Sequence, residues 1–236
     1  MNFSPAENWT LNLKTDRLLG RPFSLGDRME THNKKRIQRG QCQEVEKRLL
    51  EVATRVFADK GYSGASVQEI VRRAGVTKPV LYYYFGSKAG IFRAILDEAA
   101  YMLELLLEEV GNEPGSAVDR FLFLYTRTYQ NAAESPDVIR LIHNLLFAPP
   151  EGVPPYDYAS FPSRMLEAIK EIYAEGVARG EFVEEDPGEV AMLVLSIMDF
   201  CFHHDRSSYL LPQACHPEKL LKLAVRGLAV EDGKQT

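Results

Sequence analysis

Long apolar runs are missing from this chain of 236 residues. No stretch approaches the ~20 consecutive apolar residues that a membrane-spanning helix needs. The first residues, MNFSPAENWTLNLKTDRLLGRPF, also lack the apolar core of a secretory signal. Cysteine is scarce, and its three copies (Cys42, Cys201 and Cys215) are odd in number and widely spaced, which is typical of a reducing compartment and argues against a disulfide framework. We therefore expect a cytoplasmic protein without a membrane anchor.

Enzyme signatures are absent as well. The sequence has no GxSxG, GxGxxG, HExxH or P-loop motif. Metal ligands in structural zinc sites come in closely spaced pairs such as CxxC, and no such pair is present. The set that comes nearest is Cys201, His203, His204, Asp205, Cys215 and His216. We predict no catalytic residue, no metal and no cofactor, and interpret these side chains as packing or interface residues.

Positive charge is in deficit over the whole chain, whose net charge is −5 at pH 7. The deficit is uneven. The stretch from Arg28 to Arg93 holds 14 Lys and Arg against 6 Asp and Glu, whereas residues 94–236 hold 11 against 24. A basic N-terminal part favours a nucleic-acid surface there, and the acidic remainder would face away from phosphates.

Alternating strand patterns and internal repeats are lacking too, and helical periodicity dominates instead. Apolar residues at three- and four-residue steps, bounded by Ser, Gly and Pro, predict an all-α fold. The predicted helices cover residues 44–60, 67–73, 78–85, 87–110, 116–133, 136–147, 158–179, 189–204 and 217–230.

Residues 66–88, SVQEIVRRAGVTKPVLYYYFGSK, predict a helix, a tight turn and a second helix. Ser66 and Glu69 have the spacing of a capping box, and Gly75 suits the turn because glycine tolerates a positive φ. Thr77 is a second N-cap, and Pro79 falls in the first turn of the next helix. This is the geometry of a DNA-binding helix-turn-helix, whose second helix enters the major groove.

The second of these helices carries the chemistry for DNA. Lys78 begins it, three consecutive tyrosines follow (Tyr82, Tyr83 and Tyr84), and Lys88 comes just after. Ammonium and phenol groups donate hydrogen bonds to phosphates, and the rings pack on sugars or thymine methyls. A run of four aromatic residues cannot be buried on one side of a helix, so some of these rings are expected at the surface.

Residues 45–96 resemble the DNA-binding domain of the TetR/AcrR family of bacterial transcriptional regulators. The matching pieces are ATRVFADKGYSGAS (Ala53 to Ser66) and VQEIVRRAGVTKPVLYYYFGSKAGIF (Val67 to Phe92), with Tyr84 where the family commonly has His. The resemblance implies DNA contacts at Ser66, Gln68, Thr77, Lys78, Pro79, Tyr82, Tyr83, Tyr84 and Lys88. It also implies a homodimer formed by the last two long helices, a palindromic operator and a small-molecule effector that releases the protein from DNA.

Three domains are predicted: an N-terminal extension over residues 1–40 without fixed structure, a helix-turn-helix domain over 41–92, and a ligand-binding and dimerisation domain over 93–236. The extension holds Lys34, Lys35, Arg36 and Arg39, which form either a DNA arm or a solvated tail. A ligand pocket like those of the family would draw on Tyr125, Tyr129, His143, Phe147, Tyr173, Met192 and Ser196, although any of these also suits a packed core. The competing interpretation of the whole chain is a helical protein-interaction module or an all-α enzyme without DNA affinity.

Overall fold

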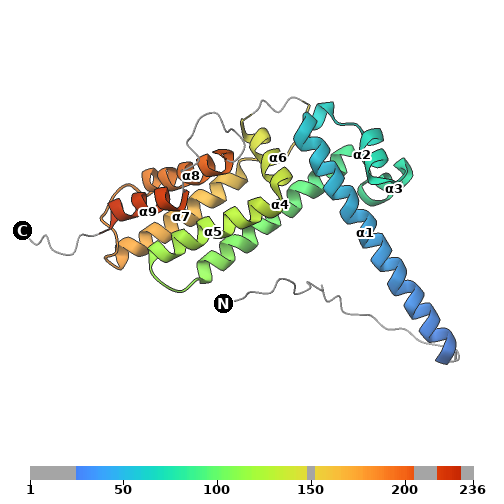
Figure 1. Cartoon of the computed structure of the whole chain (residues 1–236), viewed down its shortest axis with the longest axis horizontal. Coiled ribbons are helices and arrows are strands. Elements are labelled where there is room, and N and C mark those ends of the chain that lie inside the picture. Colours follow the sequence, from blue (N-terminus) through green and yellow to red (C-terminus); the bar gives the residue numbers. More distant parts are fainter. Residues whose placement is uncertain (1–24, 148–151, 205–216, 230–236) are drawn as a thin grey trace, which may run out of the picture. The chain divides into compact units, whose positions relative to one another are not determined.

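The computed structural model describes residues 25–147, 152–204 and 217–229, and the side chains of residues 42–147, 152–199 and 218–229. The elements are α1 (Leu25–Gly64), α2 (Val67–Ala74), α3 (Lys78–Phe85), α4 (Lys88–Asn112), α5 (Ala117–Glu134), α6 (Pro136–Phe147), α7 (Ser160–Ala178), α8 (Pro187–His204) and α9 (Pro217–Leu228) (Figure 1). In these ranges the only extended pairing is a single bridge between Phe182 and Ala229. The predicted all-α fold is confirmed. Across the described ranges, no helix has both the length and the apolar character to cross a membrane.

The chain divides into two compact units, residues 1–44 and 45–236. The described backbone of the first unit, from Leu25 on, is helical, whereas the sequence predicted a helix only from residue 44. The prediction missed this part because residues 30–41, ETHNKKRIQRGQ, carry good helix formers but no apolar stripe. At the other end the predicted stop is correct. Gly61 leaves the helical region with φ 69° and ψ 173°.

Two clusters of buried apolar side chains lie in the second unit. The first is built by α1 to α4, with Leu49, Phe57, Ile70, Leu81 and Phe92 among its fully buried members. Truncating a buried side chain of this kind to alanine costs about 2–5 kcal/mol of stability. The cluster therefore fixes the positions of α2 and α3 against α1 and α4.

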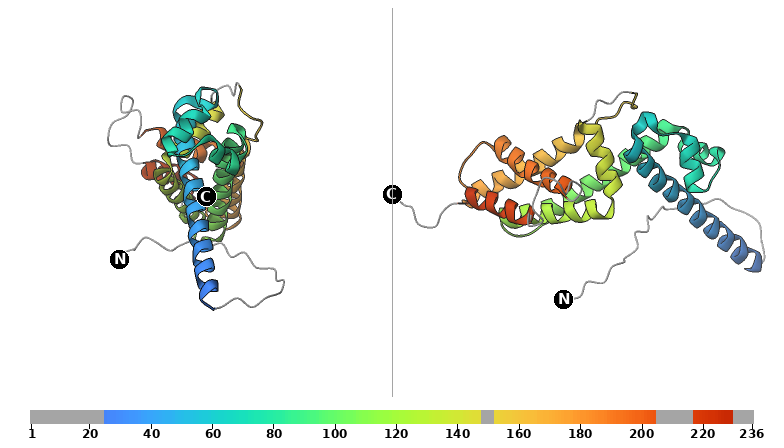
Figure 2. Two further views of the ribbon diagram at one scale, coloured as in Figure 1. Left: turned by 90° about the vertical axis from the view of Figure 1, so that its right-hand side faces the viewer. Right: turned by 45° about the horizontal axis from the view of Figure 1, so that its top comes forward.

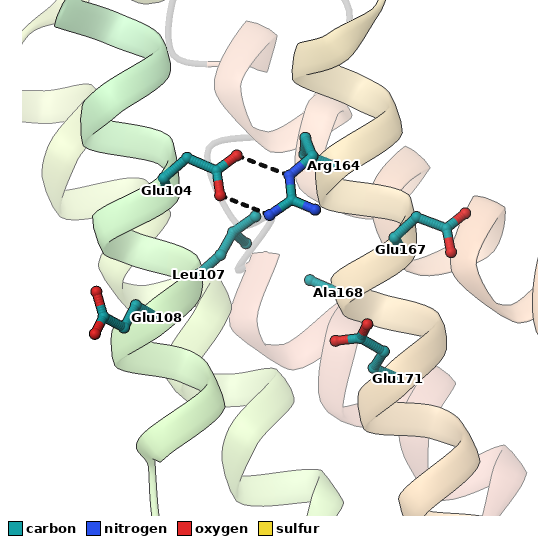
Figure 3. Close-up of a pocket in the computed structure, with 7 residues that line it drawn as sticks. All are labelled: Glu104, Leu107, Glu108, Arg164, Glu167, Ala168 and Glu171. Atoms are coloured by element: carbon teal, nitrogen blue, oxygen red, sulfur yellow. Dashed lines mark hydrogen bonds and ion pairs between the residues drawn. The ribbon is translucent and has the colours of Figure 1, made fainter.

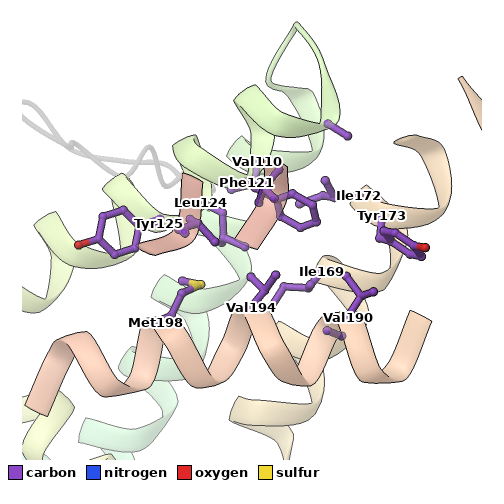
Figure 4. Close-up of a cluster of buried hydrophobic side chains, with 14 of the residues drawn as sticks. Val110, Phe121, Leu124, Tyr125, Ile169, Ile172, Tyr173, Val190, Val194 and Met198 are labelled. Atoms are coloured by element: carbon purple, nitrogen blue, oxygen red, sulfur yellow. The ribbon is translucent and has the colours of Figure 1, made fainter. Parts of the chain in front are cut away.

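The second cluster joins the far end of α4 to α5, α7, α8 and α9. Its centre holds Phe121, Leu124, Ile169 and Val194 (Figure 4). α7 and α8 lie side by side, with α5 against α7 (Figure 2). The single helix α4 therefore contributes to both clusters, Phe92 and Ile95 to the first and Leu106 and Val110 to the second.

α6 belongs to the first cluster through Leu141, which is buried among residues of α1 to α4. Polar contacts hold the same helix on the end of α1. Arg140 Nη2 lies 2.6 Å from the Asp59 carboxylate, and Asn144 Nδ2 donates to the Ala58 carbonyl at 3.3 Å. The predicted domain boundary at residue 92 thus separates Leu141 from side chains that it packs against.

A buried arginine links the helices of the second cluster. Arg120 of α5 donates from Nε to the Val110 carbonyl at 3.2 Å and from Nη1 to the Glu175 carboxylate of α7. Glu175 also accepts from Arg179 at 3.0 Å. A charge with one ionic partner and one carbonyl acceptor is tolerated inside a protein because it is paired and hydrogen-bonded.

Candidate nucleic-acid interface

The first helix of the motif, α2, starts at the residue that the sequence predicted. Ser66 is extended (φ −123°, ψ 145°), and its hydroxyl accepts a hydrogen bond from the Glu69 amide at 3.2 Å. The second half of the predicted capping box is wrong. The Glu69 carboxylate accepts from Lys60 Nζ at 2.8 Å and pairs with Arg73 at 2.7 Å, and the hydrogen bond from Lys60 is the main reason that the pKa of Glu69 is lowered. A charged partner outcompetes the backbone amide for the carboxylate.

The turn after α2 is closed as its glycine predicts. Gly75 has φ 65° and ψ 35°, which a side chain would disfavour. Its amide donates to the Arg72 carbonyl at 3.3 Å, and the Val76 amide donates to the Val71 carbonyl at 3.0 Å. This pair of bonds is a Schellman motif, and it fixes the angle at which the chain enters α3.

α3 is a two-turn helix anchored by one buried side chain, Leu81. Its outer face carries Tyr82, 46% exposed, and Tyr83, 82% exposed. Tyr84 is half-buried, and its ring meets the Tyr83 ring edge-on at 5.2 Å. Tyr82 and Tyr83 lie outside the buried cluster, which leaves the exposed parts of their rings available to a binding partner.

The N-terminus of α3 is open. Thr77 has the extended backbone of an N-cap (φ −101°, ψ 159°), but its side chain forms no capping hydrogen bond. Pro79 lies in the first turn, as predicted, where its missing N–H costs little. Lys78 is exposed beside it. The positive end of the helix dipole thus lacks a side-chain cap and has an exposed lysine next to it, an arrangement that attracts anions.

The junction between α3 and α4 is tight. The Ser87 amide donates to the Phe85 carbonyl at 2.7 Å, and the Ser87 hydroxyl caps α4 by accepting from the Gly90 amide at 2.9 Å. A Cβ on Gly90 would lie 1.8 Å from the Phe85 carbonyl oxygen. Only glycine fits there, so the sequence fixes the position of α3 against the start of α4 through this residue.

Lys88, the first residue of α4, lies against an aromatic ring. Its Nζ is 4.2 Å from the centroid of the Tyr62 ring. Burial lowers the pKa of the Lys88 ammonium below 10.5. The sequence predicted that Lys88 holds a phosphate but gave no sign of this ring, because Tyr62 lies beyond the break at Gly61 and outside any helical pattern.

Most of the predicted DNA contacts share one exposed region. Ser66, Gln68, Thr77, Lys78, Pro79, Tyr82 and Tyr83 are exposed, while Tyr84 and Lys88 are half-buried. The basic charge of this region is smaller than the sequence count suggests. Lys60 and Arg73 share Glu69, and Arg55 lies 3.4 Å from Asp137 of α6.

The residues predicted for a ligand pocket are spread over the C-terminal helices. Tyr125 stacks on the partly exposed Tyr129 at 6.2 Å, and the His143 and Phe147 rings lie 4.5 Å apart. Met192 and Ser196 are exposed on α8. Tyr173 is buried, where its hydroxyl donates to the Val183 carbonyl and accepts from the Glu185 amide, both at 2.7 Å. These contacts give Tyr173 a structural role.

A groove of about 330 Å³ lies between α4 and α7 (Figure 3). Arg164 spans it with two hydrogen bonds to Glu104, of 2.7 and 2.6 Å, and these bonds are the main reason that the pKa of Glu104 is lowered. The rest of the lining is Leu107, Glu108, Glu167, Ala168 and Glu171. With four carboxylates and two apolar residues, this groove lacks the apolar lining of a typical small-molecule pocket.

Metal-binding clusters of three or more His, Cys, Asp or Glu are not found among the described residues. The cysteines and histidines that the sequence analysis weighed, from Cys201 to His216, lie outside the described side chains. The basic arm residues, Lys34 to Arg39, lie outside them as well.

Residues 49–95 match the family model of bacterial regulatory proteins of the tetR family. The A-factor receptor protein of Streptomyces griseus is 33% identical over 151 residues, which are 63% of this chain and 50% of the receptor. The FasR transcriptional activator of Mycolicibacterium smegmatis is 52% identical over 48 residues, 20% of this chain and 22% of FasR. The chain thus spans half or less of the length of these two relatives.

Solved structures share the fold over most of the chain. NalD, the secondary repressor of the MexAB-OprM multidrug efflux pump in Pseudomonas aeruginosa, superimposes with a TM-score of 0.61 at 22% identity, covering 80% of this chain and 98% of NalD. AibR, solved in complex with isovaleryl coenzyme A and operator DNA, gives 0.59 at 20% identity, covering 78% and 98%. The helix-turn-helix geometry and the family match agree: residues 49–95 form the helix-turn-helix domain of the tetR family of bacterial regulatory proteins, within a fold that these solved structures share.

Proposed function

We propose that this protein is a homodimeric transcriptional regulator, in which α3 of each subunit binds one half of a palindromic operator. The observation that carries the proposal is the surface of α3. Tyr82 and Tyr83 are exposed on a helix anchored by the buried Leu81, with the exposed Lys78 at its open N-terminus. Short reading helices enter the major groove with their N-terminal residues leading.

The proposed contacts divide by chemistry. Lys78 and Tyr82 lie nearest to base edges or to their flanks, together with Thr77 and Pro79 at the tip of the helix. Tyr83, Tyr84 and Lys88 bind phosphates, because phenol and ammonium groups are donors and phosphate oxygens are acceptors. Ser66 and Gln68 approach the backbone from the start of α2, where the helix dipole favours an anion.

We propose that α8 and α9 form the dimer interface. Met192 and Leu193 of α8, and Leu220 and Leu223 of α9, are exposed apolar side chains. α8 also packs on α9, so these residues belong to neighbouring elements. Covering such surface stabilises association by about 25 cal/mol for each Å² removed from water. A two-fold dimer would place two reading helices about one DNA turn apart.

A small-molecule effector is proposed to release the protein from its operator, which would make it a cytoplasmic repressor. The relatives support this, since one is named a receptor and another was solved with isovaleryl coenzyme A and operator DNA. The effector would act by tilting α4, the helix shared by both clusters. Such a shift requires that the effector bind one arrangement better than the other. Tyr125, Tyr129, His143, Phe147, Met192 and Ser196 stay proposed pocket residues.

Binding of the purified protein to DNA from immediately upstream of its own gene tests the proposal. The measurement is made over a salt series, against duplexes of random sequence. We expect sequence-dependent binding with two subunits, or a multiple of two, on each site. Affinity should fall steeply with salt, because each neutralised phosphate releases counterions. Each phosphate contact contributes about −0.9 to the slope of the logarithm of the binding constant against the logarithm of the salt concentration.

Each alternative outcome has a definite meaning. Salt-insensitive binding, or binding of a protein partner with no DNA affinity, would replace the regulator with a protein-interaction module. Absence of affinity for the upstream region is followed by selection from a random duplex pool, with protein freed of bound small molecules by unfolding and refolding. Failure of that selection would overturn the proposal.

A further inference from the structure

The environment of Lys88 differs from that of an ordinary surface lysine. Its Nζ lies 4.2 Å from the Tyr62 ring centroid, within the ~6 Å over which a ring face attracts a cation. The ring occupies one side of the ammonium and leaves N–H donors on the other side for an oxygen acceptor. Holding the long side chain in one place in advance also reduces the entropy lost when it binds.

Tyr62 is itself held by two buried rings. It follows Gly61, whose positive φ turns the chain out of α1. Its ring stacks on Phe57 at 5.8 Å with an interplanar angle of 17°, and it meets Phe92 edge-on at 4.9 Å. Phe57 and Phe92 are both fully buried. The platform under Lys88 therefore has a fixed orientation.

The segment after α6 supports the same platform from the C-terminal part of the chain. Tyr158 packs against the first cluster with its hydroxyl bonded to the Pro154 carbonyl at 2.7 Å. Burial raises the pKa of Tyr158, the Arg93 guanidinium lowers it, and the nearby Tyr62 phenol raises it further.

Further contacts anchor this segment to α1 and α4. A Cβ on Gly152 would lie 2.9 Å from the Ser63 hydroxyl, next to Tyr62 in sequence. Tyr156 donates to Asp97 of α4, and its ring lies 5.6 Å from the Tyr158 ring at a tilt of 41°. Residues 152–158 therefore lie against the end of α1 that carries Tyr62.

We propose that Tyr62 is a positioning residue for operator binding, which places the Lys88 ammonium for a DNA phosphate and is itself held by residues 152–158. The inference rests on the proposed function and deepens it. It links residues 152–158 to a phosphate contact through Tyr62 and Lys88, in addition to any tilt of α4. A rearrangement of residues 152–158 would move the Tyr62 ring, and the moved ring would change the position of the Lys88 ammonium.

A double-mutant cycle tests the proposal, using a duplex that wild-type protein has selected from a random-sequence pool. The variants are Tyr62→Leu, Lys88→Gln and the pair. Tyr62→Leu is expected to weaken binding about 5- to 30-fold for two subunits, as follows from losing one exposed cation–π contact in each. In the Lys88→Gln background the same change should have an effect of less than about twofold, since the two residues act as one unit.

Two further proteins separate positioning from packing. Tyr62→Phe keeps the ring and should recover most of the affinity lost with leucine. A fluorinated phenylalanine at position 62 keeps the shape but removes the negative ring face, and it should weaken binding while leaving the thermal midpoint of unfolding unchanged. This second protein keeps the test valid if Tyr62→Leu fails to fold.

The segment has its own arm of the test. Tyr156→Phe and Tyr158→Phe retain their rings but lose their anchoring hydrogen bonds, so each should weaken DNA binding in the presence of Lys88 and have no effect in Lys88→Gln. Tyr101→Phe, on an exposed tyrosine of α4, serves as the control.

Equal losses from Tyr62→Leu with and without Lys88 would overturn the inference and leave the regulator intact. Retained affinity with the fluorinated ring would also overturn it. Wild-type protein that selects no duplex at all would overturn the proposed function first, and the positioning role with it.

Discussion

At the scale of single residues, the exposed tyrosines of α3 carry the proposed function. Tyr83→Ala is expected to weaken operator binding by about fivefold or more, because one phosphate hydrogen bond in each of two subunits contributes about 0.5–1.5 kcal/mol. Fluorescence anisotropy with a labelled operator measures the change. The matched control is Tyr101→Ala, since Tyr101 of α4 is 63% exposed against 82% for Tyr83. Equal effects from the two variants would remove Tyr83 from the interface.

Tyr156 gives the protein a distinct dependence on alkaline pH. Burial, and then the hydrogen bond to Asp97, raise the pKa of Tyr156 from 10.0 to about 12. The folded state thus keeps a proton that the unfolded chain releases. The stabilisation is complete below pH 10 and is lost as the pH rises through the folded pKa of about 12.

Urea unfolding across this pH range measures that loss. Tyr156→Phe should flatten the fall of the unfolding free energy between pH 10 and about 12. Asp97→Asn should narrow the pH range over which the unfolding free energy falls, because removing the carboxylate charge lowers the pKa of the Tyr156 phenol. An unchanged pH profile in Tyr156→Phe would show that another group causes the fall.

The residues that the sequence could not place are those whose partners are distant along the chain. Ser66 capped α2 as predicted, since a cap depends on residues three positions away. Glu69 did not, because Lys60 and Arg73 compete for the same carboxylate. Tyr62 was missed for a related reason. Its partner Lys88 is 26 positions away, and no periodic pattern relates the two.

At the scale of elements, the junction between α3 and α4 depends on Gly90. A methyl group there would overlap the Phe85 carbonyl, and backbone cannot move aside as a flexible side chain would. Gly90→Ala should lower stability by about 1–3 kcal/mol or more. It should also reduce DNA affinity by displacing α3.

Gly111→Ala is the matched control on the same helix. Nothing lies within 4 Å of a Cβ at Gly111, so alanine there should raise stability by about 0.5–1 kcal/mol through its better helix propensity. Thermal and urea unfolding compare the two variants. Similar stabilities would mean that the α3–α4 junction relaxes to admit the methyl group.

Helices were predictable because their signals are local. From α2 to α9, the predicted ends fall within two residues of the observed ones. Caps, glycines and prolines mark those ends, and apolar residues repeat at helical spacing between them. The start of α1 was missed because a polar helix has no such repeat. The membership of Leu141 in the first cluster was missed because packing between α6 and α1 leaves no trace in the spacing of either.

At the scale of the whole molecule, the proposed dimer makes a direct prediction. Met192→Lys puts a charge on an α8 residue that is 54% exposed in the single chain, so it should fold normally as a monomer. In the dimer the charge would lose its water, at a cost of several kcal/mol. Sedimentation should show monomers of the variant at concentrations where the wild type is dimeric. Operator affinity should fall because the dimer is lost.

Leu146→Lys places the same charge on a partly exposed leucine of α6 and serves as the control. A dimer that persists in Met192→Lys with wild-type DNA affinity would exclude this face of α8 from the interface.

Leu141 tests how far the helix-turn-helix depends on the rest of the chain. Leu141→Ala should lower stability by about 2–5 kcal/mol, because it leaves a cavity in the first cluster. Hydrogen exchange should show the loss of protection in α1 to α4 as well as in α6. The partly exposed Leu146 of the same helix provides the comparison, with an expected loss below about 1 kcal/mol for alanine. Protection lost in α6 alone would mean that the two parts unfold separately.

The packing of Leu141 also bears on how such a protein can be recombined. If the helix-turn-helix domain were cut from this chain at residue 95, it would expose an apolar face that normally contacts α6. An effector domain from another protein would have to supply a leucine that packs on this face. The exchangeable module is therefore discontinuous in sequence: α1 to the start of α4 together with residues 140–158. Chimeras that exchange both pieces should regulate, whereas chimeras that exchange only the first should fold poorly or ignore their effector.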